Sequence, residues 1–106
     1  RRSSDLMSPE QIKNEHIDHR SDIYSLGATF YFLLTGKTGF SGTAMQLMYQ
    51  ILHNAPIPPH EINTAVPESL SSIVLKMMEK EPEERYLDMG KVVEVLENYE
   101  KRKGAK

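Results

Sequence analysis

The stretch Asp22-Ile23-Tyr24-Ser25-Leu26-Gly27 opens the most apolar part of this sequence and decides how the rest is interpreted. A helix built from it and the following residues has almost no polar stripe, because its apolar members are Ile23, Leu26, Ala28, Phe30, Tyr31, Leu33 and Leu34. We therefore expect a helix that is buried on most of its circumference. Asp22 would begin this helix as its N-cap, and a buried carboxylate there would need hydrogen-bond donors or a cationic partner.

Three further segments carry apolar residues at the spacing of an amphipathic helix. They cover residues 44–52, 70–78 and 89–99. Each is preceded by a residue suited to a helix start, namely Thr43, Pro67 and Asp88, and the Asp88 carboxylate can cap the free amides of the first turn. A shorter helix is expected over residues 9–14, with Pro9 in its first turn.

The fold class follows from these helices. No alternating strand pattern of useful length is present, so the sequence predicts an all-α fold with about five main helices. Residues 54–66 contain three prolines and are expected to form an extended connection. Residues 101–106 are expected to be a frayed polar tail.

Composition limits the classes of function. The 106 residues can hold one core, and 39% hydrophobic with 26% charged residues is ordinary for a globular domain. A formal net charge of -2 gives no general electrostatic case for nucleic acid or an anionic membrane. The absence of cysteine excludes a disulfide scaffold, a zinc ribbon and a thiol nucleophile. No targeting segment or membrane-length apolar run is visible, so a cytoplasmic location is the default expectation.

Two short motifs have simple structural interpretations. His16 and His19 are close in sequence, but a third metal ligand would have to be Asp18 or Asp22, so we assign no metal site and expect a loop histidine pair. The stretch Pro56-Ile57-Pro58-Pro59 matches the P-x-x-P pattern of groove-binding ligands. Proline is also common wherever a chain leaves a helix, and we favour that explanation.

A set of motifs points to a known family. Ser8-Pro9-Glu10-Gln11 precedes the Asp22 stretch, and Leu34-Thr35-Gly36, Phe40 and Glu81-Pro82-Glu83-Glu84-Arg85-Tyr86 follow it. In this order and spacing, the motifs resemble the large lobe of eukaryotic-like Ser/Thr protein kinases, most closely those of bacteria. The resemblance covers nearly the whole chain. It implies that residues 1–106 are a partial kinase domain, the helical C-terminal half of the large lobe from the end of the activation segment onward.

The resemblance implies roles for individual residues. Glu10 and Arg85 would form a buried ion pair that ties the end of the activation segment to the last helices. Asp22 would accept hydrogen bonds from the backbone of the catalytic loop. The same motifs give structural roles to Pro9, Ser25 and Gly27.

The resemblance also implies two surfaces that face a protein substrate. One is the loop that carries Ser3, Met7 and Ser8, and the other is the helix predicted over residues 43–53. Two residues depart from the usual family pattern in this loop, since Arg2 replaces a glycine and Leu6 replaces a tyrosine.

The motifs for phosphoryl transfer do not occur in this sequence. There is no G-x-G-x-x-G, V-A-I-K, H-R-D or D-F-G, so nothing here would position the γ-phosphoryl group. The resemblance implies that a parent kinase uses ATP and Mg²⁺ to phosphorylate protein Ser or Thr. This chain alone has no catalytic, cofactor-binding or metal-binding residues and should be inactive.

The expected partners are the missing N-terminal part of the kinase domain and a protein substrate, with no nucleic acid and no membrane segment in this chain. The parent could be tethered to a membrane elsewhere. An alternative is a complete small helical interaction module or a pseudokinase remnant without catalysis. The departures at Arg2 and Leu6 favour this alternative, whereas the apolar Asp22 helix counts against it, because a free-standing module needs polar cover. A fragment should expose apolar surface and bind hydrophobic dyes or self-associate.

Overall fold

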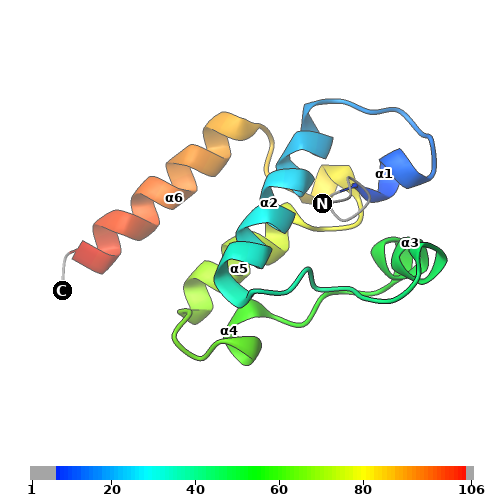
Figure 1. Ribbon diagram of the computed structural model, residues 1–106. Helices are drawn as coiled ribbons and strands as arrows, with labels where there is room; N and C mark the ends of the chain where they lie inside the picture. The colour runs from blue at the N-terminus through cyan, green and yellow to red at the C-terminus, as the bar shows by residue number, and fades with distance from the viewer. Residues whose placement is uncertain (1–6, 105–106) are drawn as a thin grey trace.

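The computed structural model of the protein describes residues 7–104, and every regular element in that range is helical (Figure 1). The elements are α1 (Pro9–Ile12), α2 (His19–Thr35), α3 (Ala44–His53), α4 (Pro59–Ile62), α5 (Glu68–Met77), the 3-10 turn η2 (Pro82–Glu84) and α6 (Met89–Gly104). The predicted all-α fold is confirmed, and the five predicted helices correspond to α1, α2, α3, α5 and α6. Within residues 7–104, no helix is both long enough and apolar enough to span a membrane.

The central helix α2 begins earlier than predicted, because Asp18 and not Asp22 is its N-cap. The Asp18 carboxylate accepts a hydrogen bond from the Arg20 backbone N–H at 2.9 Å. The helix ends at Gly36, whose φ of 75° lies in the left-handed region that glycine adopts without strain. Asp22 lies in the first turn and is exposed, so the prediction of a buried N-cap at this position is wrong.

Burial of α2 is confined to one side of the helix. The buried residues are Ser21, Ile23, Tyr24, Gly27, Ala28 and Tyr31. By contrast, the Leu33 side chain is 71% exposed and the Phe32 side chain 40%. Leu26, Phe30 and Leu34 are half-buried against the two core clusters, so the expected burial around most of the circumference fails at the strip that includes Asp22, Phe32 and Leu33. At this strip, α2 keeps exposed apolar side chains.

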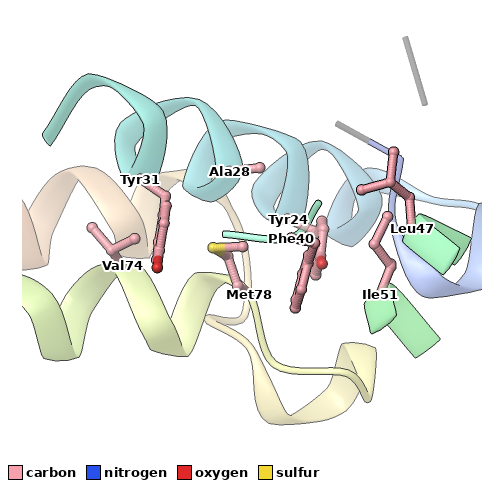
Figure 2. Packing of buried hydrophobic residues seen from close by; sticks show 8 residues of the cluster. All are labelled: Tyr24, Ala28, Tyr31, Phe40, Leu47, Ile51, Val74 and Met78. Atoms are coloured by element: carbon pink, nitrogen blue, oxygen red, sulfur yellow. The ribbon is translucent and has the colours of Figure 1, made fainter. Parts of the chain in front are cut away.

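Helices α2 and α5 lie side by side at the centre of the molecule (Figure 1). Gly27 permits this approach, because a Cβ at that position would lie only 2.8 Å from the Met77 Cβ. Figure 2 shows the larger core cluster, in which α2, α3, α5 and the Phe40 loop contribute side chains around this pair. Its buried members are Tyr24, Ala28, Tyr31, Phe40, Leu47, Ile51, Val74 and Met78.

Helix α6 packs against the α2 and α5 pair, on the other side from α3 (Figure 1). It is anchored by a second cluster whose buried members are Ile23, Ile73, Met77, Tyr86 and Val92. The loop before α6 is tied to the start of α2, where His19 Nε2 lies 2.9 Å from the Leu87 carbonyl oxygen. The molecule is consequently elongated, with extents of 45 × 28 × 22 Å.

The predicted caps at Thr43 and Asp88 are confirmed. The Thr43 hydroxyl accepts from the Gln46 backbone N–H at 3.2 Å, and Gln46 Oε1 accepts from the Thr43 backbone N–H at 2.9 Å, which completes a capping box. Asp88 Oδ1 accepts from the Lys91 backbone N–H at 2.9 Å. These local signals therefore locate the starts of α3 and α6.

The predictions for residues 54–66 and 101–106 also differ from the structure. The connection over residues 54–66 contains the single turn α4, since Pro59 has a fixed φ that suits a first helical position. Pro56 and Pro59 are both buried, so the P-x-x-P pattern does not present its two terminal prolines to a partner. The polar tail expected from residue 101 is helical as far as Gly104, and residues 105 and 106 lie outside the described range.

Candidate functional site

The Arg85 guanidinium directs all five of its N–H donors to groups inside the protein. Two donors reach the Glu10 carboxylate, from Nη1 to Oε2 at 2.7 Å and from Nη2 to Oε1 at 2.9 Å. The other three reach backbone carbonyl oxygens, of Arg20 at 2.9 Å, Glu79 at 2.7 Å and Lys80 at 3.3 Å. The Arg85 side chain is 0% exposed, so loss of any of these bonds would leave a buried polar group unpaired.

Glu10 is the anionic partner and is almost as deeply buried, with a side chain that is 4% exposed. Its Oε2 also accepts a hydrogen bond from the Ser21 hydroxyl at 2.6 Å. Burial alone would raise the pKa of Glu10, but hydrogen bonds from Arg85 and Ser21 and the Arg85 charge outweigh it, and the pKa falls to about 2. The carboxylate is therefore ionised at neutral pH, and the contact is a bidentate ion pair.

This site joins three parts of the chain that are far apart in sequence. Glu10 lies in α1, Ser21 in the first turn of α2, and Arg85 directly after η2. The Tyr24 ring covers the guanidinium, with 5.0 Å from its centroid to Arg85 Cζ, which adds a cation–π contact. The ion pair predicted between Glu10 and Arg85 is thus present.

The local structure of α1 explains how Glu10 is positioned. Pro9 occupies the first helical turn, and Ser8 forms a capping box with Gln11, accepting from its backbone N–H at 3.3 Å. Ser8 is 0% exposed, so its hydroxyl is engaged within α1 and the prediction that Ser8 faces a substrate is corrected. Met7 is half-buried, whereas Ser3 lies outside the described residues.

The remaining predicted residues of α2 lie on different sides of the helix. Gly27 is buried against Met77, where it allows the close approach of α5. Asp22 is exposed and Ser25 is half-buried, and their spacing of three residues places them as neighbours on the more open side of α2. The structure therefore assigns a packing role to Gly27 and presents Asp22 at the surface.

The histidine pair of the sequence does not converge on one point. His19 contacts the Leu87 carbonyl oxygen, whereas His16 Nε2 lies 3.8 Å from Asp18 Oδ2. Among residues 7–104, no group of three or more His, Cys, Asp or Glu side chains is placed to hold a metal ion.

Two residues near the site were not identified from the sequence. Ser21 lies one and two turns before Tyr24 and Ala28 on the buried side of α2, and this spacing is the signal that could have identified it. Lys80 lies with its Nζ 4.8 Å from the centre of the Phe40 ring and 3.5 Å from the Gln50 carbonyl oxygen. No pattern in the sequence pointed to that contact.

Comparison with known proteins identifies the family. The sequence model of the protein kinase domain matches residues 2–97. The chain is 36% identical over 100 residues to a protein named as a probable serine/threonine-protein kinase of Clostridium perfringens, covering 93% of this chain and 15% of the relative. It is 39% identical over 85 residues to the serine/threonine-protein kinase PknB of Mycobacterium leprae, covering 79% of this chain and 14% of PknB.

The fold of the chain is similar to that of a solved kinase structure. The twitchin kinase region of C. elegans superimposes with a TM-score of 0.77 at 18% identity, covering 90% of this chain and 16% of that structure. The chain spans about 15% of the length of the curated relative from Clostridium perfringens. The resemblance inferred from the S-P-E, D-x-x-S-x-G and late arginine motifs is confirmed, and the chain belongs to the protein kinase family.

Proposed function

We propose that this chain is the structural part of the large lobe of an ATP-dependent Ser/Thr protein kinase. In this role, the Glu10 and Arg85 pair fixes the segment that leads into α1 relative to α2 and α6. The observation that supports the proposal is the ion pair itself, which joins residues 75 positions apart with every guanidinium donor used. A pair of this kind costs about 3 to 5 kcal/mol to break by removal of one partner.

The proposed reaction of the parent enzyme is transfer of the ATP γ-phosphoryl group, with Mg²⁺, to a Ser or Thr hydroxyl of a protein. The side chains described over residues 7–104 do not fit a magnesium site, because they offer no cluster of acidic ligands. The sequence likewise contains no phosphate-binding glycine motif. We assign nucleotide and metal binding to the N-terminal part of the domain, and this chain takes no part in the chemical step.

Asp22 and the open side of α2 are the proposed contact with that N-terminal part. An exposed carboxylate in a first helical turn can accept hydrogen bonds from backbone N–H groups. The family resemblance implies that these N–H groups belong to the catalytic loop. Leu33, which is 71% exposed, and Phe32 supply apolar surface on the same helix. A neighbouring segment of the domain would satisfy Asp22 and cover these side chains together.

The proposed substrate-facing surface combines the segment at Met7, together with Ser3, and helix α3. Met45 and Tyr49 of α3 are 82% and 62% exposed, which leaves large side chains available to a protein partner. Ser8 is excluded from this surface by its burial.

The test is a kinetic comparison in the full-length protein. Glu10→Gln keeps the shape of the side chain but removes the charge that faces Arg85, so kcat/KM for a protein substrate should fall by about tenfold or more through misplacement of the substrate segment. The KM for ATP should stay unchanged. Glu15→Gln is the matched control, because the Glu15 side chain is exposed and its carboxylate pairs with Lys13 at 3.4 Å. Full activity of the Glu10→Gln enzyme toward protein would contradict the proposal, as would a selective rise in the KM for ATP.

A further inference from the structure

A cavity of about 420 Å³ lies between α2, the loop over residues 37–41, the end of α3 and the connection that leads into α4. Its volume falls within the range of about 300 to 1,000 Å³ that small-molecule sites occupy. The residues that line it belong neither to the buried ion pair nor to the exposed strip of α2. This cavity is therefore separate from the surfaces that have been given a role above.

Tyr31 holds the walls of this cavity together. Its hydroxyl donates a hydrogen bond to the Ile57 carbonyl oxygen, which ties the connection after α3 to α2. On the loop side, Gly39 lies so close to the ring that a Cβ there would come within 3.2 Å of Tyr31 Cε1. The Gln50 side-chain amide donates to the Ser41 carbonyl oxygen at 2.7 Å, and Gln50 Oε1 accepts from the Ser41 N–H at 3.3 Å. The protein itself thus fixes the walls, as in other pre-formed ligand sites.

One part of the cavity wall is apolar. Tyr31 and Phe40 are its buried aromatic residues, and Ile57 and Ile62 add aliphatic side chains. Ile57 is 56% exposed, so a ligand in the cavity would remove apolar surface from water. Aromatic groups also pack favourably against other rings in offset or edge-to-face geometry. This part of the wall favours a flat aromatic group.

The polar part of the wall supplies hydrogen-bond donors and a positive charge. Lys37 and Ser41 are exposed lining residues, and within residues 7–104 neither the Lys37 ammonium nor the Ser41 hydroxyl has a hydrogen-bonding or ionic partner. Thr38, by contrast, already donates to the Phe40 carbonyl oxygen at 2.6 Å. Among the described residues that line the cavity, none is Asp or Glu. An anionic acceptor would therefore meet unpaired donors and no repelling charge.

The charge of the wall fits a carboxylate better than a phosphate. Lys37 is the one cationic residue among the lining residues described here. Its single charge balances that of a carboxylate, whereas a phosphate monoester carries about −1.5 to −2 charges at neutral pH.

We propose that this cavity is a binding site for a small aromatic monocarboxylate. The ring of the ligand packs against Phe40 and Ile57, and its carboxylate pairs with the Lys37 ammonium and accepts from the Ser41 hydroxyl. A ligand in this place bridges the loop over residues 37–41 and the connection after α3. The proposal does not depend on the proposed phosphotransfer activity.

The chain offers matched pairs of variants for a test. Ile57 and Leu87 are both exposed, and the backbone carbonyl oxygen of each is contacted by a side chain of α2. Ile57→Ser removes part of the cavity wall, whereas Leu87→Ser alters a side chain that does not line it. Lys37→Gln removes the cation of the cavity, and Lys101→Gln removes an exposed cation from α6, on the other side of α2 and α5 from α3 (Figure 1). Because all four side chains are exposed, the substitutions should leave the fold intact.

The experiment is photoaffinity labelling of the full-length protein with a benzoate that carries a diazirine group in the para position. A non-hydrolysable ATP analogue fills the nucleotide site, and peptide mass spectrometry locates the labelled residues. We expect the label to concentrate within residues 37–41 and 57–62. At a probe concentration below saturation, Ile57→Ser and Lys37→Gln should each lower this labelling about fivefold, and Leu87→Ser and Lys101→Gln should leave it unchanged. The corresponding benzamide has no charge and should label about fivefold less than the benzoate.

Label spread evenly over the surface, or labelling that both cavity variants leave unchanged, would overturn the proposal. Equal labelling by the benzamide would contradict recognition of a carboxylate by Lys37. Competition supplies a second arm, in which unlabelled benzoate should protect the cavity better than phenyl phosphate does. The reverse order would mean that the site selects a phosphate, and the assignment of a carboxylate ligand would be wrong.

Discussion

At the scale of single residues, Arg85 shows why its position requires an arginine. A planar guanidinium offers five donors in a fixed fork, and here two meet a carboxylate while three meet carbonyl oxygens that diverge around it. A lysine ammonium offers three donors from one point and would leave at least two of these buried groups unpaired. The site therefore selects for geometry as well as charge.

The Glu10 carboxylate should make the free energy of unfolding depend on pH in the acidic range. Its pKa is about 2 in the folded protein against an ordinary value of 4.5, so the unfolded state binds more protons between these values. The stabilisation from Glu10 is complete above about pH 4.5 and is lost as the pH falls toward 2. Asp18, whose pKa the Arg20 hydrogen bond lowers to about 2, acts in the same direction.

Urea unfolding at several pH values can isolate the contribution of Glu10. The Glu10→Gln variant retains Asp18, so its free energy of unfolding should vary less steeply between pH 2 and pH 4.5 than that of the unmodified chain. Parallel curves for the two proteins in this window would show that Glu10 titrates normally.

At the scale of elements, the contact between α2 and α5 depends on the absence of a side chain at Gly27. In Gly27→Ala, the new Cβ would meet the Met77 Cβ, which belongs to the helix framework and cannot move like the end of a long side chain. We expect a loss of about 1 to 3 kcal/mol from overpacking, reduced by the better helix propensity of alanine. Thermal unfolding would measure it.

Gly90 offers the matched control for this substitution. It also lies in a helix, but it is exposed, and a Cβ there would approach only the Asp88 side chain at 3.3 Å. Gly90→Ala should therefore leave the melting temperature unchanged or raise it. Equal destabilisation by both substitutions would mean that helix packing at Gly27 is not the cause.

The elements also show what the sequence could and could not predict. Helices α3, α5 and α6 are amphipathic and have clear start signals, so their periodicity located them well. The start of α2 was misjudged because Asp18 and Asp22 are both plausible caps, and only the three-dimensional path of the preceding loop selects Asp18. The turn α4 was missed because a proline-rich stretch suggests extended chain, although Pro59 suits a first helical turn.

At the candidate site, the sequence identified Glu10 and Arg85 only through the family motifs. Nothing in local spacing links residues that are 75 positions apart. The burial of Ser8 and the exposure of Asp22 depend on which neighbours are present, and such information is absent from a local pattern. The burial of Ser21 could have been predicted from helical spacing, because Ser21 shares the buried side of α2 with Tyr24.

At the scale of the whole molecule, α2 leaves apolar side chains uncovered. Leu33 is 71% exposed, and we propose that this side of α2 contacts the remainder of the kinase domain. The isolated chain should therefore bind a hydrophobic dye such as ANS, and Leu33→Gln should weaken dye fluorescence without loss of stability. Met45→Gln is the control for another surface, since Met45 lies on α3 and is 82% exposed.

In the full-length protein, the same substitutions should behave differently. In the full-length protein, the side chain at position 33 would be buried, so Leu33→Gln should lower the free energy of unfolding of the domain. Met45→Gln should leave this free energy unchanged. If Leu33→Gln were neutral in the full-length protein as well, the open side of α2 would not be an internal contact of the domain.

The whole fold also depends on the connection between its first and last segments. Glu10 in α1 and Arg85 before α6 are joined by their buried ion pair. The most direct test is a double-mutant cycle with Glu10→Gln, Arg85→Met and the double variant, each followed by urea unfolding. We expect the two substitutions to be strongly non-additive, with a coupling free energy of about 2 to 3 kcal/mol. Additive effects, with a coupling below about 0.5 kcal/mol, would contradict it.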